Sequence, residues 1–266
     1  MNLRRKTVLA MTVMPIIMIV VTYFSAQFIL MDNYAVLEKQ RSEVNVKRGL
    51  SALSNVLSEL DSTVSDWAAW DDTYTFIQDV NEDYIESNVI DSTFINLDIN
   101  IMLFINTEGE VVYGREFNLT SINETPVSQE LLDSLSANDF LWRHTDPENS
   151  VTGTVPLEKA PLLIASQPIL TSQKEGPTQG TLIMGRYLDS EKIEKLAETI
   201  YLPLTVTSLE ETEEQINFQT VYSSSFLGNA PIFTRPLNDD IMGGYTLIED
   251  VYGNFAFTLR VDTSQD

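Results

Sequence analysis

An uncharged run of 25 residues, from Thr7 to Met31, constrains this chain more than any other feature. As an α-helix the run would be about 37 Å long, enough to cross a hydrocarbon core of about 30 Å. The competing interpretation is a cleaved secretory signal, whose apolar stretch is usually about 7–15 residues and ends at small residues. This run is longer and ends in bulky side chains, Phe28-Ile-Leu-Met31. It therefore predicts an uncleaved transmembrane helix over residues 7–31.

The charges on either side of the run predict its orientation. Arg4, Arg5 and Lys6 directly precede it, whereas Asp32 directly follows it. Segments rich in Lys and Arg stay on the cytoplasmic side of a membrane. We therefore expect residues 1–6 in the cytoplasm and residues 32–266 outside it, in contact with the lipid bilayer only through the predicted span.

The net charge of −23 is unevenly distributed. Residues 1–48 hold seven basic and three acidic groups, whereas the rest of the chain holds nine basic and 36 acidic groups, a net of −27. Nucleic-acid binding needs clustered Lys and Arg to neutralise phosphates, so the composition excludes nucleic acid as a partner. The acidic part is predicted to be the extracytoplasmic domain.

The chain contains no Cys and a single His, which removes whole classes of catalytic and metal chemistry. Disulfides, thiolate nucleophiles and Cys-ligated metals are excluded. His144 lacks a G-x-S-x-G nucleophile motif elsewhere in the chain, so we expect a packing or surface histidine. The alternating Asn96, Asp98 and Asn100 lack the Gly and Glu of a calcium loop and predict a solvated strand face. We expect a protein that is not an enzyme and has no cofactor or metal.

A helical stripe follows the predicted span, within residues 32–66. Apolar residues recur there at alternating steps of four and three, an a/d heptad pattern sustained for three heptads. The stripe fits a parallel homodimer that carries a signal towards the membrane, and it fits equally a helix that packs on its own domain. The residues of this predicted dimer or signalling stripe are Val46, Leu50, Leu53, Leu57, Leu60 and Val64.

Beyond residue 98 the pattern becomes that of strands joined by short turns. Helices are predicted at Ser128–Ala137 and Ser190–Ile200, each preceded by residues typical of helix starts. Short antiparallel connections with helices to one side predict an α+β fold. The strands are predicted at Ile99–Thr107, Glu110–Phe117, Pro161–Leu170, Gly180–Leu188, Leu204–Leu209, Tyr245–Val251 and Asn254–Val261, those within 211–266 being the C-terminal strands of the domain.

An aromatic and acidic cluster lies where the heptad stripe ends. On a helix, Trp67, Trp70 and Tyr74 share one face, with Asp71 and Asp72 beside it. One interpretation is structural: the two carboxylates hydrogen-bond the join between helix and sheet. The other is an aromatic-walled recess whose carboxylates face a cationic or polyhydroxyl ligand.

Three motifs in this part of the chain resemble a known family. They are Trp67-Ala-Ala-Trp70-Asp71-Asp72-Thr-Tyr74, Tyr84-Ile-Glu-Ser-Asn88 and Asn106-Thr-Glu-Gly109-Glu-Val-Val-Tyr-Gly114. Together they resemble the fourth class of CHASE domain, a cyclase/histidine-kinase-associated sensory extracellular domain, over about residues 60–210. The resemblance implies a PAS-like or Cache-like antiparallel sheet flanked by helices. Trp67, Trp70, Asp71, Asp72 and Tyr74 carry over as signature or ligand-binding positions.

The resemblance also implies a function. We expect a membrane receptor whose outer domain detects an unknown small-molecule ligand and drives a cytoplasmic output of the histidine kinase or cyclase type. That output would lie on a longer chain or on a partner. The alternative is an envelope-anchored structural or interaction domain without a small-molecule ligand. The sequons Asn118-Leu-Thr120 and Asn123-Glu-Thr125 are compatible with glycosylation outside the cell.

Overall fold

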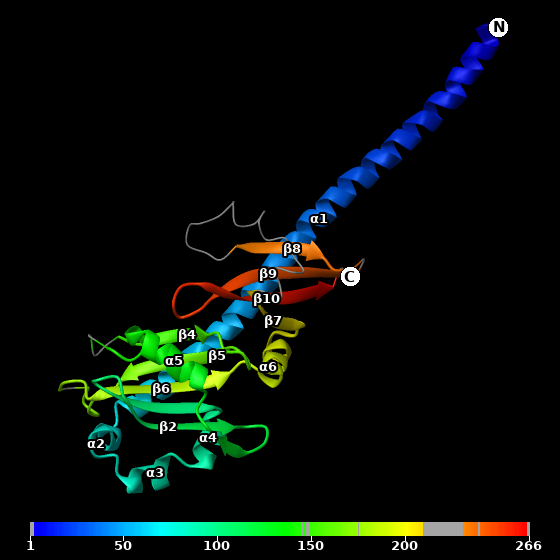
Figure 1. Cartoon of the computed structure of the whole chain (residues 1–266). Coiled ribbons are helices and arrows are strands. Elements are labelled where there is room, and N and C mark those ends of the chain that lie inside the picture. The colour runs from blue at the N-terminus through cyan, green and yellow to red at the C-terminus, as the bar shows by residue number, and fades with distance from the viewer. Residues whose placement is uncertain are drawn as a thin grey trace.

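One helix, α1 (Leu3–Ala68), runs past two antiparallel sheets and continues beyond them towards the N-terminus (Figure 1). The computed structural model describes residues 3–144, 146, 149–174, 176–209, 231–238 and 240–264, and the side chains of residues 3–12 and 26–35 lie outside this description. The C-terminal strand lies beside the middle of α1 (Figure 1). The fold is of mixed α/β type with antiparallel sheets, in line with the predicted α+β class.

The first sheet has six strands in the order β3-β2-β1-β6-β5-β4. Three short helices join α1 to it, and α5 with a 3-10 turn covers its other face (Figure 1). The bounds are α2 (Asp71–Asp79), α3 (Glu82–Asn88), α4 (Asp91–Leu97), β1 (Ile101–Asn106), β2 (Val111–Asn118), β3 (Asn123–Thr125), α5 (Gln129–Ala137), η1 (Asp139–Leu141), β4 (Val151–Val155), β5 (Leu162–Pro168) and β6 (Gly180–Tyr187).

The central strands of this sheet are buried on both faces. In β1, Met102 and Phe104 point to the α1 side, whereas Leu103 and Ile105 point to the side of α5. Strands β5 and β6 divide their side chains in the same way. Because successive residues of a strand alternate between faces, an apolar run in a covered sheet feeds two cores at once.

The second sheet has four strands in the order β7-β10-β9-β8. Helix α6 (Ser190–Ile200) leads into it, and its strands are β7 (Leu204–Ser208), β8 (Ile232–Pro236), β9 (Ile241–Glu249) and β10 (Phe255–Ser264). The predicted C-terminal strands therefore belong to a second sheet, in which β7, from the preceding segment, pairs with β10. The acidic segment at 210–214, whose charge run predicts a solvated loop, lies outside the described residues.

The heptad stripe of α1 packs against these sheets. Val46, Leu60 and Val64 are fully buried, and Leu53 is nearly so. They belong to one core with residues of both sheets, and Leu50, Leu57 and Trp67 pack at its edge. The stripe is thus used within its own chain, as one of the two interpretations requires, and the homodimer stays a prediction.

Within the described part of the chain, no helix is both long and apolar enough to span a membrane. Of the predicted span at 7–31, only the side chains of residues 13–25 are described. Those thirteen residues are helical, and their side chains are exposed. The transmembrane helix therefore stays a prediction.

The sequence did not reveal α3 and α4, and one strand assignment there was wrong. The helix predicted through Trp67, Trp70 and Tyr74 is interrupted, because Trp70 has an extended backbone between α1 and α2. Asn96, Asp98 and Asn100 do not share a strand face. Asn96 lies in α4, Asp98 caps that helix with a left-handed φ of 54°, and Asn100 is buried. The side chain of Asn100 donates to the carbonyl of Phe117 and accepts from the backbone of Tyr187, so it joins two strands.

Helix α1 approaches the second sheet most closely at glycine. A Cβ on Gly244 of β9 would lie 2.4 Å from Ser42 Oγ and 2.6 Å from Val46 Cγ2. A Cβ on Gly49 of α1 would lie 3.0 Å from a side-chain atom of Val261. The close approach of helix and sheet is therefore possible only because residue 244 has no side chain.

We expect Gly244→Ala to destabilise the chain by about 1–3 kcal/mol, because the added methyl forces α1 away from β9. Denaturant unfolding in a membrane mimetic measures the loss. The control is Ser54→Ala, which removes an exposed hydroxyl from α1 and should leave stability unchanged. Equal stability of Gly244→Ala and the wild type would mean that the helix does not sit this close to the sheet.

Candidate functional site

The aromatic and acidic motif lies at the turn where α1 ends and α2 begins. Trp67 and Trp70 meet edge to face with ring centroids 5.8 Å apart. The backbone N–H of Leu170, just after β5, donates to the carbonyl of Ala68 at 3.0 Å. The C-terminal end of α1 is therefore hydrogen-bonded to the segment that follows β5.

Asp71 ties this turn to the loop between β5 and β6. Its carboxylate accepts the backbone N–H of Ser172 at 2.8 Å and the Ser172 hydroxyl at 2.7 Å. The backbone hydrogen bond from Ser172, followed by the hydroxyl, holds the pKa of Asp71 below its ordinary value, because both donors favour the ionised carboxylate. No side-chain hydrogen bond of the neighbouring, exposed Asp72 is found among the described residues.

Tyr74 contacts the far end of the same loop. Its hydroxyl donates to the carbonyl of Pro177 at 3.4 Å and accepts from the Gln179 amide at 3.2 Å. Asp71 and Tyr74 thus hold the two ends of the loop that joins β5 to β6. Asp71 therefore hydrogen-bonds the join between helix and sheet, as the structural interpretation predicts, whereas Asp72 makes no such bond among the described residues. The ligand-binding role of these residues stays a prediction.

The second motif packs against α2. Tyr84 of α3 is buried, stacks on Phe76 with centroids 4.3 Å apart, and shares a hydrogen bond of 2.7 Å with Thr73. Burial raises the pKa of Tyr84 to about 12, although the Thr73 hydrogen bond acts in the opposite direction. The phenol stays neutral at physiological pH and serves in packing.

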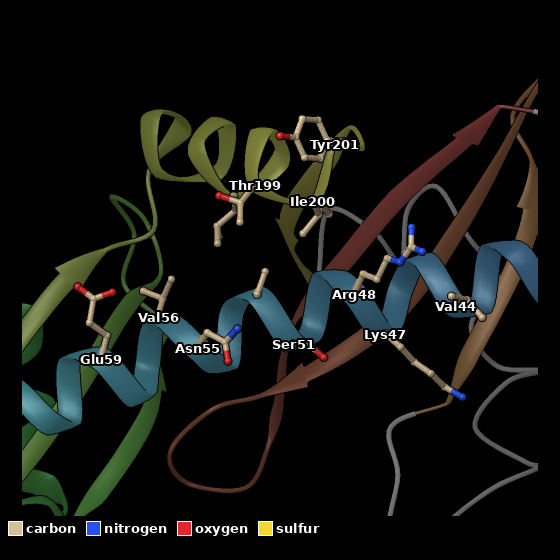
Figure 2. Close-up of a pocket in the computed structure, with 12 residues that line it drawn as sticks. Val44, Lys47, Arg48, Ser51, Asn55, Val56, Glu59, Thr199, Ile200 and Tyr201 are labelled. Carbon is tan, nitrogen blue, oxygen red and sulfur yellow. The ribbon is translucent and has the colours of Figure 1, made fainter.

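A groove of about 810 Å³ lies between α1 and α6 (Figure 2). Ala52 and Val56 of α1 form one wall, and Leu196 and Ile200 of α6 form the other. This volume falls in the range of small-molecule sites, about 300–1,000 Å³. No sequence pattern predicts this groove, because it arises where two helices that are distant in the sequence meet.

Charged and aromatic groups mark the two ends of the groove. Arg48 lies at one end and Glu59 at the other, both on the side of α1 that faces α6, whereas the ammonium of Lys47 points away from α6 (Figure 2). Tyr201, which ends α6 with a left-handed φ of 57°, is 92% exposed and lies at the Arg48 end (Figure 2). Among the ion pairs of the described residues, none involves Arg48.

An ion-pair network closes the Glu59 end. Arg186 of β6 is nearly buried and lies 4.0 Å from Glu59 and 3.7 Å from the Asp98 carboxylate. Its guanidinium also donates to the carbonyls of Leu97 and Asp98, at 3.0 and 2.6 Å. Lys192 of α6 pairs with the same Asp98. The network joins α1, α4, β6 and α6, the four elements around this end of the groove.

His144 occupies a second, smaller pocket of about 420 Å³ near β4 and β5. Its Nε2 lies 3.0 Å from the hydroxyl of Ser166, and that hydroxyl donates to the carbonyl of Leu141. Burial lowers the pKa of His144, and a backbone hydrogen bond at Asn149 partly opposes this. Since the serine proton points at a carbonyl, the pair is not arranged as nucleophile and base.

The two sequons lie on one exposed hairpin turn. Asn118 ends β2 and accepts the backbone N–H groups of Thr120 and Ser121, each at 3.0 Å. Asn123 begins β3 and is exposed. Glycosylation at these residues stays a prediction.

The site thus consists of a long helix that packs on two antiparallel sheets, with a groove and an ion-pair network where it meets the connecting helix. Comparison with known proteins identifies the family. Residues 52–207 match the CHASE4 domain, and the chain belongs to this family. It is 32% identical over 239 residues to the methanogenesis regulatory histidine kinase FilI of Methanothrix harundinacea (strain 6Ac), covering 89% of this chain and 26% of that protein. The chain thus spans about a quarter of that relative's length.

Solved structures share the fold. The extracellular domain of a protein described as a histidine kinase, vpHK1S-Z8, aligns with a TM-score of 0.55 at 14% identity, covering 88% of this chain and 93% of that one. A domain of a sensory box/GGDEF family protein from Vibrio parahaemolyticus aligns with a TM-score of 0.56 at 12% identity, covering 87% and 97%. These structures show a shared fold, whereas the assignment of the chain as a sensory domain rests on the CHASE4 match and on the relationship to a histidine kinase.

We expect Asp71→Asn to lower the unfolding midpoint at pH 7, because the neutral amide is a weaker acceptor for the two Ser172 donors. The pKa of Asp71 is lower in the folded chain than its ordinary value of about 4, so the stabilisation is present above that pH. It is lost as the pH falls through the folded-state pKa, where variant and wild type should converge.

Thermal unfolding at a series of pH values measures this difference. Asp72→Asn is the matched control, since it removes an adjacent exposed carboxylate and should change the midpoint little. An equal loss for Asp71→Asn and Asp72→Asn at pH 7 would contradict the specific role of the Ser172 hydrogen bonds.

Proposed function

We propose that this chain is the membrane-anchored, extracytoplasmic, non-enzymatic ligand-sensing part of a signalling receptor. Residues 1–6 lie in the cytoplasm, residues 7–31 cross the membrane and residues 32–266 lie outside. Ligand occupancy is relayed through α1 to a cytoplasmic output of the histidine kinase type, on a longer chain or on a partner. The relationship to FilI, named as a histidine kinase, supports this choice of output over a cyclase.

One observation carries the proposal: α1 is a single uninterrupted helix that contacts both sheets and extends to the uncharged run. A helix transmits displacement along its axis because its hydrogen bonds are internal. A ligand shifts such a helix only if it binds two arrangements with unequal affinity. The α1 packing surface and the groove beside it are where such arrangements would differ.

A homodimer is part of the proposal, because two copies anchored in one membrane would present parallel α1 helices. The stripe formed by Val46, Leu53 and Leu60 is occupied by the chain's own sheets. Self-association would therefore use other residues, those of the membrane span among them.

The proposed topology is tested by cysteine labelling. Because the chain has no native Cys, only the introduced residue can be labelled. In intact cells, Ser54→Cys should react with a membrane-impermeant maleimide, because Ser54 is exposed on the outer part of α1. Asn2→Cys should react only after the cells are lysed. Labelling of both positions in intact cells would rule out a cytoplasmic N-terminus.

The sensing function is tested with the full chain in lipid nanodiscs, screened by thermal shift against a metabolite library. A ligand at 100 times its Kd should add about 2.7 kcal/mol of stability. Fused to a histidine kinase, the chain should then change autophosphorylation when the ligand is added. Inserting Gly-Gly between Leu37 and Glu38 should leave ligand binding intact and abolish the kinase response, since it interrupts α1.

The alternative, an envelope-anchored interaction domain, predicts a different pattern. No metabolite would shift the unfolding midpoint, and the chain would be retained by isolated cell-envelope material. That combination of results would overturn the sensing function.

A further inference from the structure

We propose that the groove between α1 and α6 binds a small organic monocarboxylate, with the carboxylate on Arg48 and an apolar body between the two helices. The inference rests on the proposed sensor function and goes further by naming a site and a chemical class of ligand. The groove's walls, its charged ends and its exposed aromatic rim carry the argument (Figure 2).

The anionic character of the ligand follows from Arg48. Its guanidinium is exposed, makes one long contact of 3.4 Å with the Asn45 side chain, and takes part in none of the ion pairs found among the described residues. Three other cations differ: Arg115, Arg186 and Lys192 are each paired with carboxylates. A planar guanidinium with unused donors binds a carboxylate through two parallel hydrogen bonds.

The apolar body follows from the walls and the rim. Between Arg48 and Glu59, the lining residues are apolar or uncharged: Ala52, Val56, Leu196 and Ile200 with Ser51, Asn55 and Thr199. Tyr201 is 92% exposed beside Arg48, an unusual position for a large ring that has no packing role within the described chain. A ligand whose hydrocarbon part lies under this ring would cover it, and burial of apolar surface would contribute to binding.

The restriction to one carboxylate follows from the other end. Glu59 lies eleven residues from Arg48, about 16 Å along the helix. A short diacid would place its second charge against the apolar walls, where desolvation is costly. A longer one would bring that charge to Glu59. Both positions disfavour a second anionic group.

The site is placed to act on α1. Helix α6 connects the two sheets, and α1 packs on both of them. A ligand held between the two helices favours the spacing in which both walls touch it. Occupancy therefore biases the position of α1, provided that the spacing differs between the two states of the receptor.

A second copy of the chain is the rival occupant of this face. In a parallel pair, Arg48 of one copy would lie close to Arg48 of the other, and like charges at a helix contact are destabilising. The charge therefore favours a small anion over self-association.

The test is calorimetric titration of the full chain in nanodiscs of phosphatidylcholine, at constant ionic strength, with hexanoate, adipate and hexylammonium as probes. Hexanoate should bind, whereas adipate and hexylammonium should bind at least about tenfold more weakly or not at all, given the energy of a charged hydrogen bond. Arg48→Gln should weaken hexanoate binding by about tenfold or more. Arg48→Lys should restore it in part, since one point charge replaces the two-pronged contact.

Lys47→Gln is the matched control. It removes the same charge one residue away, from a side chain that points away from α6, and should leave hexanoate affinity unchanged. The proposal fails if Arg48→Gln binds hexanoate like the wild type, or if adipate or hexylammonium binds as tightly as hexanoate. It also fails if hexanoate does not bind while Arg48→Gln or Tyr201→Ser converts a dimer into a monomer, because the groove is then a protein interface.

The two proposals fail separately. If a different metabolite stabilises the chain and drives the fused kinase equally in the wild type and in Arg48→Gln, the sensor function stands and the groove site falls. If hexanoate binds through Arg48 and neither hexanoate nor any metabolite changes kinase activity, the groove site stands and the sensor function falls.

Discussion

The close packing of α1 on both sheets is the interaction on which the rest of the structure depends. Val46 and Leu60, fully buried on one stripe, belong to a core that includes residues of the six-stranded and the four-stranded sheet. The chain has no Cys, so no disulfide reinforces this core. At Gly244 the helix comes so near the sheet that a methyl group would clash with Ser42. One helix therefore holds the two sheets in a fixed position relative to each other.

Elements with strong local signals were predictable from the sequence. Helix α6 has the predicted bounds and is capped by Asp189. Helix α5 ends as predicted and begins one residue later than predicted, at Gln129, with Ser128 as its cap. The turns at Gly109 and Gly253 have positive φ angles of 89° and 83°, which glycine adopts without strain. In these places local chemistry and tertiary packing favour the same conformation, so a sequence pattern is sufficient.

Elements decided by tertiary contacts were not predictable. Helix α2 begins at Asp71, and the preceding Trp70 provides no side-chain cap. The Asp71 carboxylate instead accepts a hydrogen bond from Ser172, 101 residues away. The heptad stripe was ambiguous because a helix that packs on a sheet and a helix in a coiled coil both bury residues at spacings of three and four. The groove between α1 and α6 has no sequence signature, since its two walls come from distant helices. In the sequence, Arg48 is indistinguishable from the other surface charges.

The distribution of charge links fold to signalling. Residues 32–266 hold 13 basic and 39 acidic groups, a net of −26. In such an acidic domain, cations paired with carboxylates stabilise particular junctions, as Arg186 does between α1, α4 and β6. Arg48 lacks such a partner among the described residues, and it lies on the one helix that is predicted to continue into the membrane. An unpaired Arg48 costs the folded chain little free energy, because its guanidinium is solvated. In the proposed receptor, the same charge would attract an anion to α1. Ligand recognition and signal relay would then meet on the same element, so that binding energy is delivered to α1 directly and not through the sheet.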